Sequence, residues 1–178
     1  MSQPPSWRDR FVQHLESLAT AEDRAALARL RRGLGKAPAS VYEVYPIVQP
    51  WLPVDLPRWD QEAAYLIASL FAAHPYTGGR GSLGRAFTEL AQARKARRRD
   101  SDSLEKRFVA LLNSHRDDLP EHLRHAVSLL AAEPVALDWR QLLDDVRHWS
   151  HPDRFVQRRW ARDYWSAGVS TAAEPAES

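Results

Sequence analysis

The sequence predicts an all-α protein, and three observations support that fold class. Apolar residues recur at spacings of three and four along most of the chain, no segment alternates convincingly between apolar and polar residues, and there is no long repeat. We expect roughly eight helices in two small packed bundles. The N-terminal bundle is predicted over residues 1–80 and the C-terminal bundle over 81–167. Residues 168–178 carry no apolar pattern and are expected to form a disordered tail.

The first two predicted helices follow from apolar spacing and from end signals. Trp7, Phe11 and Leu15 lie on one face of an amphipathic helix whose other faces are charged. The second helix is expected to take Thr20 as its N-cap and to stop at the glycines on either side of Leu34.

A proline-rich connection and a central helix complete the predicted N-terminal bundle. Residues 36–57 contain five prolines, so this segment is predicted to be mostly a connection with one short helix around 41–45. The following helix, over 59–74, is apolar enough to lie at the centre of the fold.

Two similar segments, "SLGRAF" and "SLEKRF", are each predicted to begin a helix in the second half of the chain. Ser82 is the expected N-cap of the first helix. Asp102 and Glu105 have the spacing of a capping box at the start of the second.

Three further helices are predicted from "LPEHLRHAVSLLAAEP", "LDWRQLLDDVRHW" and "HPDRFVQRRWARDYW". Pro134 closes the first of them, and Asp138 with Gln141 has capping-box spacing at the start of the second. Pro152 is expected in the first turn of the third helix.

Composition predicts a soluble globular protein, and the absence of cysteine fits a reducing compartment without establishing one. It has 178 residues, 44% of them hydrophobic and 27% charged, and no cysteine. No apolar run approaches the roughly 20 residues that cross a bilayer, and the first residues lack the pattern of a signal peptide. Disulfides, thiolate metal sites and cysteine nucleophiles are excluded. We expect a cytoplasmic protein with no membrane partner and no cofactor.

The positive charge of the chain is local and is carried mainly by arginine. The net charge is +2, but residues 76–116 alone sum to +6 and the remainder to −4. Of the 25 cationic residues, 22 are arginine, whose planar guanidinium suits phosphate and can stack on bases. A GC-rich genome also produces arginine, so the bias alone does not define a function.

No catalytic constellation stands out. The "GGRGSLG" segment lacks the ending of a phosphate-binding P-loop and follows a predicted helix. Two histidine sets, one around His122 and His125 and one around His148 and His151, lack known zinc spacing, so we predict no metal site. The adjacent carboxylates Asp117–Asp118 and Asp144–Asp145 are expected to serve solubility, and most of the tryptophans are expected to serve core packing.

Seven segments in order resemble the CasB family, the small subunit of the type I-E CRISPR surveillance complex Cascade. They are "LARLRRGLG", "VYPIVQPW", "GSLGRAF", "LEKRFVALLNS", "LRHAVSLL", "LDWRQLLDDVRHW" and "VQRRWARDYW". The resemblance extends from about Trp7 to Trp165 and is carried by the combination, since each segment alone is weakly specific.

The resemblance implies a non-catalytic, nucleic-acid-binding protein of antiviral defence. In that family the small subunit supports the R-loop formed by CRISPR RNA and the target DNA strand, and steadies the displaced non-target strand. The implied partners are CRISPR RNA, both DNA strands, the backbone subunits, the large subunit and a second copy of the chain. A protein-protein adaptor with an incidental basic surface remains the alternative, and a metal-dependent enzyme built on the histidines is a third reading.

The resemblance also indicates which cations contact nucleic acid. The candidate nucleic-acid-binding residues are Arg31, Arg32, Arg85, Lys106, Arg107 and Arg124, with Arg154, Arg158 and Arg159 as a second tier. For any single arginine, solvation of a helix face is an equally good explanation. The segment "AQARKARRRDSD", which contains the dense basic run "ARKARRRDSD", looks like an insertion of variable length. We expect the basic run to be a mobile loop that raises the local positive potential without making precise contacts.

Overall fold

The computed structural model describes residues 4–167, and within that range all regular secondary structure is helical, as predicted. The predicted tail, 168–178, lies outside the described residues. The α-helices are α1 (Trp7–Thr20), α2 (Arg24–Arg31), α3 (Tyr45–Val48), α4 (Arg58–Ala73), α5 (Leu83–Ala96), α6 (Asp102–Asn113), α7 (Leu119–Ala132), α8 (Trp139–Arg147) and α9 (Phe155–Ser166). Two 3-10 helices, η1 (Tyr42–Val44) and η2 (Gln49–Trp51), flank α3. None of the described helices has the length and apolarity to cross a membrane.

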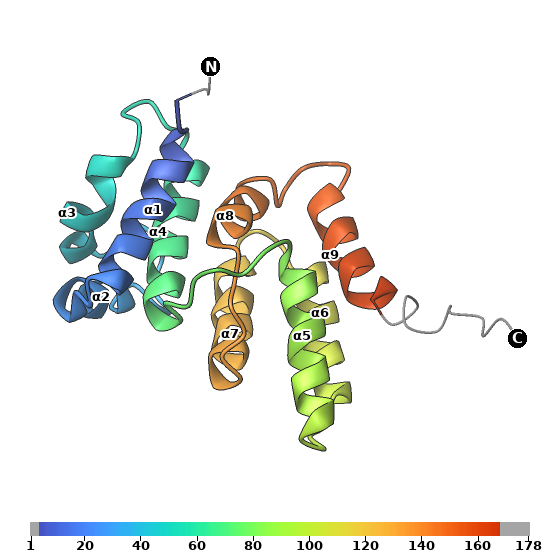
Figure 1. Cartoon of the computed structure of the whole chain (residues 1–178). Helices are drawn as coiled ribbons and strands as arrows, with labels where there is room; N and C mark the ends of the chain where they lie inside the picture. The colour runs from blue at the N-terminus through green and yellow to red at the C-terminus, as the bar shows by residue number, and fades with distance from the viewer. Residues whose placement is uncertain (1–3, 168–178) are drawn as a thin grey trace, which may run out of the picture.

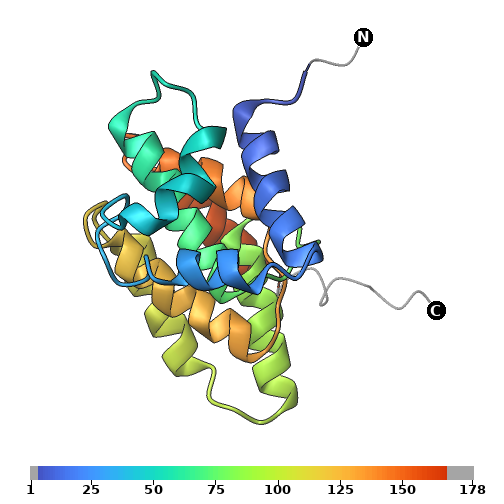
Figure 2. The ribbon, with the colours of Figure 1, turned by 90° about the vertical axis from the view of Figure 1, so that its left-hand side faces the viewer.

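The helices form two groups joined through α7 and α8. Helices α1 to α4 lie on one side, α5, α6 and α9 lie on the other, and α7 and α8 lie between them (Figure 1). The view turned by 90° shows α5, α6 and α7 extending beneath the first four helices (Figure 2). Because α4 packs against α2, α7 and α8, the first group is tied directly to the rest of the chain. The division into two bundles near residue 80 stays a prediction.

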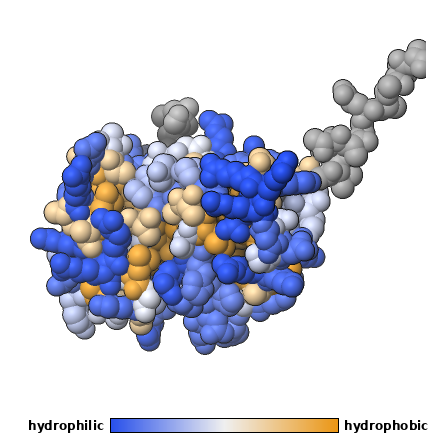
Figure 3. Space-filling model, turned by 90° about the horizontal axis from the view of Figure 1, so that it is seen from below, coloured by the Kyte–Doolittle hydropathy of each residue, from blue (hydrophilic) through white to orange (hydrophobic). Residues whose placement is uncertain are grey.

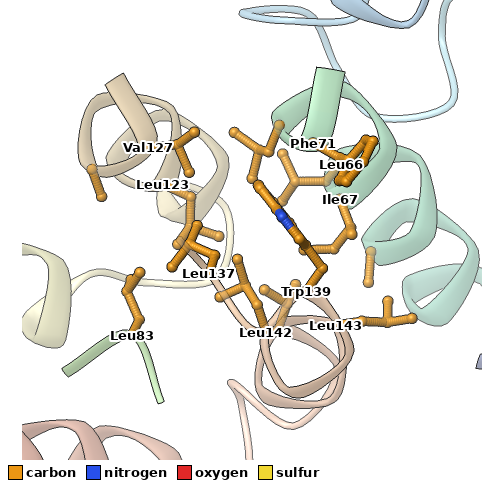
Figure 4. Close-up of a cluster of buried hydrophobic side chains, with 14 of the residues drawn as sticks. Leu66, Ile67, Phe71, Leu83, Leu123, Val127, Leu137, Trp139, Leu142 and Leu143 are labelled. Carbon is orange, nitrogen blue, oxygen red and sulfur yellow. The ribbon is translucent and has the colours of Figure 1, made fainter. Parts of the chain in front are cut away.

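The central position predicted for α4 is confirmed by its burial. Ten consecutive residues from Ala63 to Ala72 are buried, so helices cover this part of α4 on every side. Trp139 from α8 meets Phe71 edge to face, with ring centroids 5.3 Å apart. Figure 4 shows Trp139 among apolar side chains that include Leu66 of α4, Val127 of α7 and Leu142 of α8. The cluster therefore holds these three helices together.

Gly84 explains one feature of the "SLGRAF" segment. A Cβ atom at this position would overlap the backbone carbonyl of Trp160, so only glycine allows α5 and α9 to cross at this distance. Ser82 caps α5 by accepting a hydrogen bond from the Arg85 amide, as predicted. Asp138 likewise caps α8 by accepting a bond from the amide of Gln141.

Three predicted helix starts are wrong. Thr20 ends α1, where its hydroxyl donates to the Glu16 carbonyl, and Asp23 is the N-cap of α2 instead. Asp102 forms no capping box, because it is already the first residue of α6. Pro152 precedes α9, which begins at Phe155 after Arg154 in a left-handed conformation. Only α2 receives its side-chain cap from another residue, whereas α6 and α9 begin without a side-chain cap.

The prediction that paired carboxylates serve solubility is wrong for Asp145, which is 1% exposed. Its carboxylate accepts hydrogen bonds from Trp160 Nε1 at 2.6 Å, from Gln141 Nε2 at 2.8 Å and from the Arg159 guanidinium. Its neighbour Asp144 pairs with arginines from α1 and α8. Adjacent residues on a helix point in different directions, so α9 covers Asp145 while Asp144 faces α1.

Acid is expected to destabilise the protein through His74. This side chain is fully buried at the end of α4, its Nε2 lies 2.6 Å from the Val135 carbonyl, and its Nδ1 has no partner. Burial lowers the pKa of His74 from the usual 6.5, so below that pH the unfolded chain binds a proton that the folded chain does not. Stability should therefore fall as the pH falls through this range.

Urea unfolding between pH 7.5 and pH 5 checks this expectation. His74→Gln keeps a hydrogen-bond donor but cannot titrate, so the stability of this variant should fall less steeply with acid. An equal pH dependence in both proteins would show that His74 is not responsible.

Candidate nucleic-acid interface

Arg31 and Arg32 lie at the C-terminal end of α2. Arg31 is exposed, and its Nε donates to the Leu27 carbonyl one turn earlier. Arg32 donates to Glu43 at 2.5 Å, with both side chains more than half exposed. The hydrogen bond from Arg32 lowers the pKa of the Glu43 carboxyl. Arg31 forms no ion pair among the described residues. The exposed ion pair of Arg32 is weak, so a phosphate can displace the Glu43 carboxylate.

Arg124 on α7 lies across a cleft from the loop that follows Arg32. The cleft has a volume of about 280 Å³ and is lined by residues 33–38, by α4, by Asp117 and by α7. Lys36 and Arg124 are its cations, and Asp117 and Glu121 are its carboxylates. Arg124 also makes two hydrogen bonds to Glu121, at 3.0 and 2.5 Å. Folding therefore brings the end of α2 close to a helix nearly 90 residues later in the chain.

Lys106 and Arg107 are neighbouring residues of α6. Both side chains are exposed, and among the described residues no carboxylate pairs with either. Arg107 lines a hollow of about 370 Å³ together with His122 and His125 of α7. His125 lies beside Arg124, with 3.3 Å between the imidazole Nε2 and the guanidinium Nη2.

These contacts connect Lys36 in the loop after α2, Arg124 of α7 and Arg107 of α6 through the cleft, the hollow and His125. We call this surface the cationic face and include in it Arg32 and Lys106, which are exposed and lie near Lys36 and Arg107 along the chain. Viewed from below, the molecule presents clusters of hydrophilic side chains with hydrophobic residues between them (Figure 3). The cationic face presents separated charges to a phosphate backbone instead of one dense cluster.

Arg85 and Arg158 lie on α5 and α9, outside the cationic face. Arg85 is exposed and is 3.8 Å from Glu89, one turn along the helix. It lies two residues before Phe87, which faces the hollow, so it points to a different side of α5. Arg158 is exposed and has no carboxylate partner among the described residues. Neither side chain lines the hollow that contains Arg107.

Arg154 and Arg159 have partners within the protein. Arg154 donates to the Leu112 carbonyl at 2.6 Å and so ties the start of α9 to the end of α6. Arg159 pairs with the buried carboxylate of Asp145. Both guanidiniums serve the packing of α9, and their contact with nucleic acid stays a prediction.

The basic run is more ordered than the sequence indicated. Helix α5 continues through Ala96, so Arg94 and Lys95 lie in its last turn, where cations favour the helix dipole. Arg97 and Arg99 both bind Glu133, at 2.6 and 2.8 Å, and the Glu133 side chain is only 1% exposed. The expected mobile loop is therefore fastened to the end of α7 by a buried carboxylate.

Removing both partners of Glu133 should destabilise the fold. Arg97→Gln combined with Arg99→Gln leaves a buried carboxylate unpaired, and we expect the free energy of unfolding to fall by about 1–3 kcal/mol. Adding Glu133→Gln should restore most of the loss, as measured by urea unfolding in a mutant cycle. Arg98→Gln is the control, because Arg98 forms no ion pair among the described residues. An equal loss in this control would contradict the role of Glu133.

Two cations next to the candidate interface were missed by sequence reasoning. Lys36 follows the glycines after α2, and only the fold places it opposite Arg124. Arg116 lies over the ring of Trp59 at 4.7 Å and lines a second cleft of about 540 Å³ with Arg58. No motif in the sequence connects these residues, so no sequence signal could have identified them.

The histidine sets do not assemble as ligands. Within residues 4–167, no three histidine or acidic side chains come close enough to hold a metal ion. His125 is 3.2 Å from Glu121, and His151 is 3.8 Å from Asp153. These are exposed pairs on single helices or turns.

The fold and the surface define a small all-helical protein whose exposed functional groups are cations on helix surfaces. The sequence profile of the CRISPR-associated protein Cse2 family matches residues 26–165. A CRISPR-associated protein Cse2 from Thermus thermophilus is 39% identical over 166 residues, which cover 91% of this chain and 92% of that protein. This chain belongs to the Cse2 family, whose solved members include proteins named CasB, and the resemblance seen in the sequence is confirmed.

Solved structures agree with this assignment. A CasB from M. ruber has a TM-score of 0.75 and 31% identity, with coverage of 96% of this chain and 100% of that chain. A chain of a structure described as a CRISPR RNA-guided surveillance complex has a TM-score of 0.77 and 31% identity, with coverage of 94% and 98%.

Proposed function

We propose that this chain is a non-catalytic small subunit of a CRISPR RNA-guided surveillance complex of the Cascade type. Its proposed role is to bind nucleic acid through the cationic face and so stabilise the R-loop of guide RNA and target DNA together with the displaced strand. The single observation that carries the nucleic-acid role is the cationic face itself. Support for the complex comes from the related chain found in such an assembly.

Electrostatic attraction between these cations and the phosphate backbone is sufficient to stabilise an R-loop. Exchange of a DNA duplex for an RNA–DNA hybrid is nearly balanced in free energy, so backbone contacts that ignore sequence can shift the equilibrium. Lys106 and Arg107 suit such contacts because they have no carboxylate partner to lose among the described residues. Arg32 and Arg124 each exchange an exposed carboxylate for a phosphate.

The partners of this subunit follow from the same proposal. They are CRISPR RNA, the target and non-target DNA strands, the backbone and large subunits, and a second copy of the chain, all in the cytoplasm. The two-bundle division belongs to the proposal as well, since a pair of helical groups provides one surface for nucleic acid and others for protein subunits.

Salt-dependent binding tests the proposal. If the five cations of the cationic face each neutralise one phosphate, the affinity for single-stranded DNA should fall with salt at a logarithmic slope of about −3.5. The affinity should not depend on sequence. Fluorescence anisotropy with labelled oligonucleotides at several salt concentrations measures both. Failure to bind, together with normal co-purification with a CRISPR complex, would favour the protein-protein adaptor.

A further inference from the structure

The hollow beside Arg107 has the construction of a ligand site. It lies between α5, α6 and α7 and has a volume of about 370 Å³. Phe87, Leu111 and Ala126 are nearly fully buried and provide its apolar floor. A volume of this size falls at the lower end of the range for small-molecule pockets, which begins at about 300 Å³. It accommodates one planar ring system but not a strand.

The polar side chains around the hollow are those of one arginine and two histidines. Arg107 lies on the α6 side, and His122 and His125 lie on the α7 side. Of the described residues that line the hollow, none is acidic. The nearby carboxylate of Glu121 is already engaged by Arg124 and His125. The local charge therefore favours a ligand with an apolar planar part and an anionic part.

Single-stranded nucleic acid combines these two parts in each nucleotide. Bases that leave the stack are held by apolar and aromatic surfaces, by histidine and by the guanidinium planes of arginine. A base in the hollow would leave its phosphates at the rim, beside Arg107 and the rest of the cationic face. An apolar side chain of a partner protein would fill the floor but would not use the cations.

We propose that this hollow binds one unstacked base of a single-stranded nucleic acid while Arg107 contacts an adjoining phosphate. The inference rests on the proposed function and deepens it, because it gives the subunit a base-dependent contact in addition to backbone electrostatics. A strand held in this way is fixed in position along the protein, whereas charge alone lets it slide.

The test compares oligothymidylate with an abasic oligonucleotide of the same length and charge. The unmodified chain should bind oligothymidylate about tenfold more tightly. Ala110→Leu fills the hollow from an exposed helix position without changing charge. This variant should bind both oligonucleotides equally, with an unchanged salt slope. Ala25→Leu, at an exposed position of α2 that does not line the hollow, is the matched control and should keep the tenfold preference.

The possible outcomes are distinguishable. Equal binding of both oligonucleotides by the unmodified chain, with a normal salt slope, overturns the base site and leaves the proposed function intact. An undiminished preference in Ala110→Leu also overturns the base site. If that variant binds DNA normally but enters the CRISPR complex poorly, the hollow holds a protein side chain instead. If the unmodified chain shows no salt-dependent binding to either oligonucleotide, the result contradicts the proposed function and the base site together.

Discussion

Asp145→Ala is expected to lower the free energy of unfolding by about 3–5 kcal/mol, the usual effect of removing one partner from a buried ion pair. The substitution leaves the Trp160 indole N–H and the Gln141 amide without their acceptor. It also leaves Arg159 without its counter-charge. Because these partners belong to α8 and α9, we expect α9 to lose its fixed position. Urea unfolding followed by tryptophan fluorescence measures the change.

Two comparisons make this expectation specific. Asp153→Ala removes an exposed carboxylate just before α9, whose only ion pair in the described part of the chain is with His151, and it should change stability by less than about 1 kcal/mol. Asp145→Asn keeps the shape and one acceptor oxygen, so it should cost less than Asp145→Ala. An alanine variant as stable as the original protein would mean that α9 is held by apolar packing alone.

Neutralising three members of the cationic face should have the largest effect on nucleic-acid binding. The triple variant carries Arg32→Gln, Arg107→Gln and Arg124→Gln. It should lose three phosphate contacts, one at the end of α2, one on α6 and one on α7. Each contact contributes about −0.7 to the salt slope on single strands, so the slope should become shallower by about 2. The affinity at 0.1 M salt should fall about 100-fold. The measurement is anisotropy of labelled single-stranded DNA across a salt series.

The matched control removes the same charge elsewhere. Arg10, Arg80 and Arg162 are exposed and do not line the hollow or the cleft. Their triple replacement by glutamine should leave the slope nearly unchanged, and circular dichroism should show the same helical content in both triple variants. Equal losses of affinity in the two variants would mean that net charge, and not the cationic face, controls binding.

Local signals in the sequence identified the helices because they act within one or two turns. The apolar stripe of α1, the caps Ser82 and Asp138 and the apolar composition of α4 are all properties of neighbouring residues. The start of a helix was predicted wrongly where two residues three positions apart both offered a capping side chain, as Thr20 and Asp23 do. The wrong N-cap left the identity of the helix unchanged.

The candidate site was predicted only in part. Arg107 and Arg124 were selected from segments that resemble a family, and the structure connects them through His122 and His125. Lys36 was missed, since nothing near it in the sequence refers to α7. Arg159 was selected as a second-tier residue from another such segment, but its guanidinium lies against Asp145.

The sequence by itself determined an all-helical chain, the face that each helix buries and the excess of arginine that makes a phosphate partner credible. Only the tertiary structure decided which charges are free and which are used internally. Glu133 and Asp145 look like ordinary surface carboxylates in the sequence, yet each is buried and bound to arginine. The physical reason is distance: hydrophobic periodicity follows from neighbours along the chain, whereas an ion pair depends on residues that packing brings together from far apart.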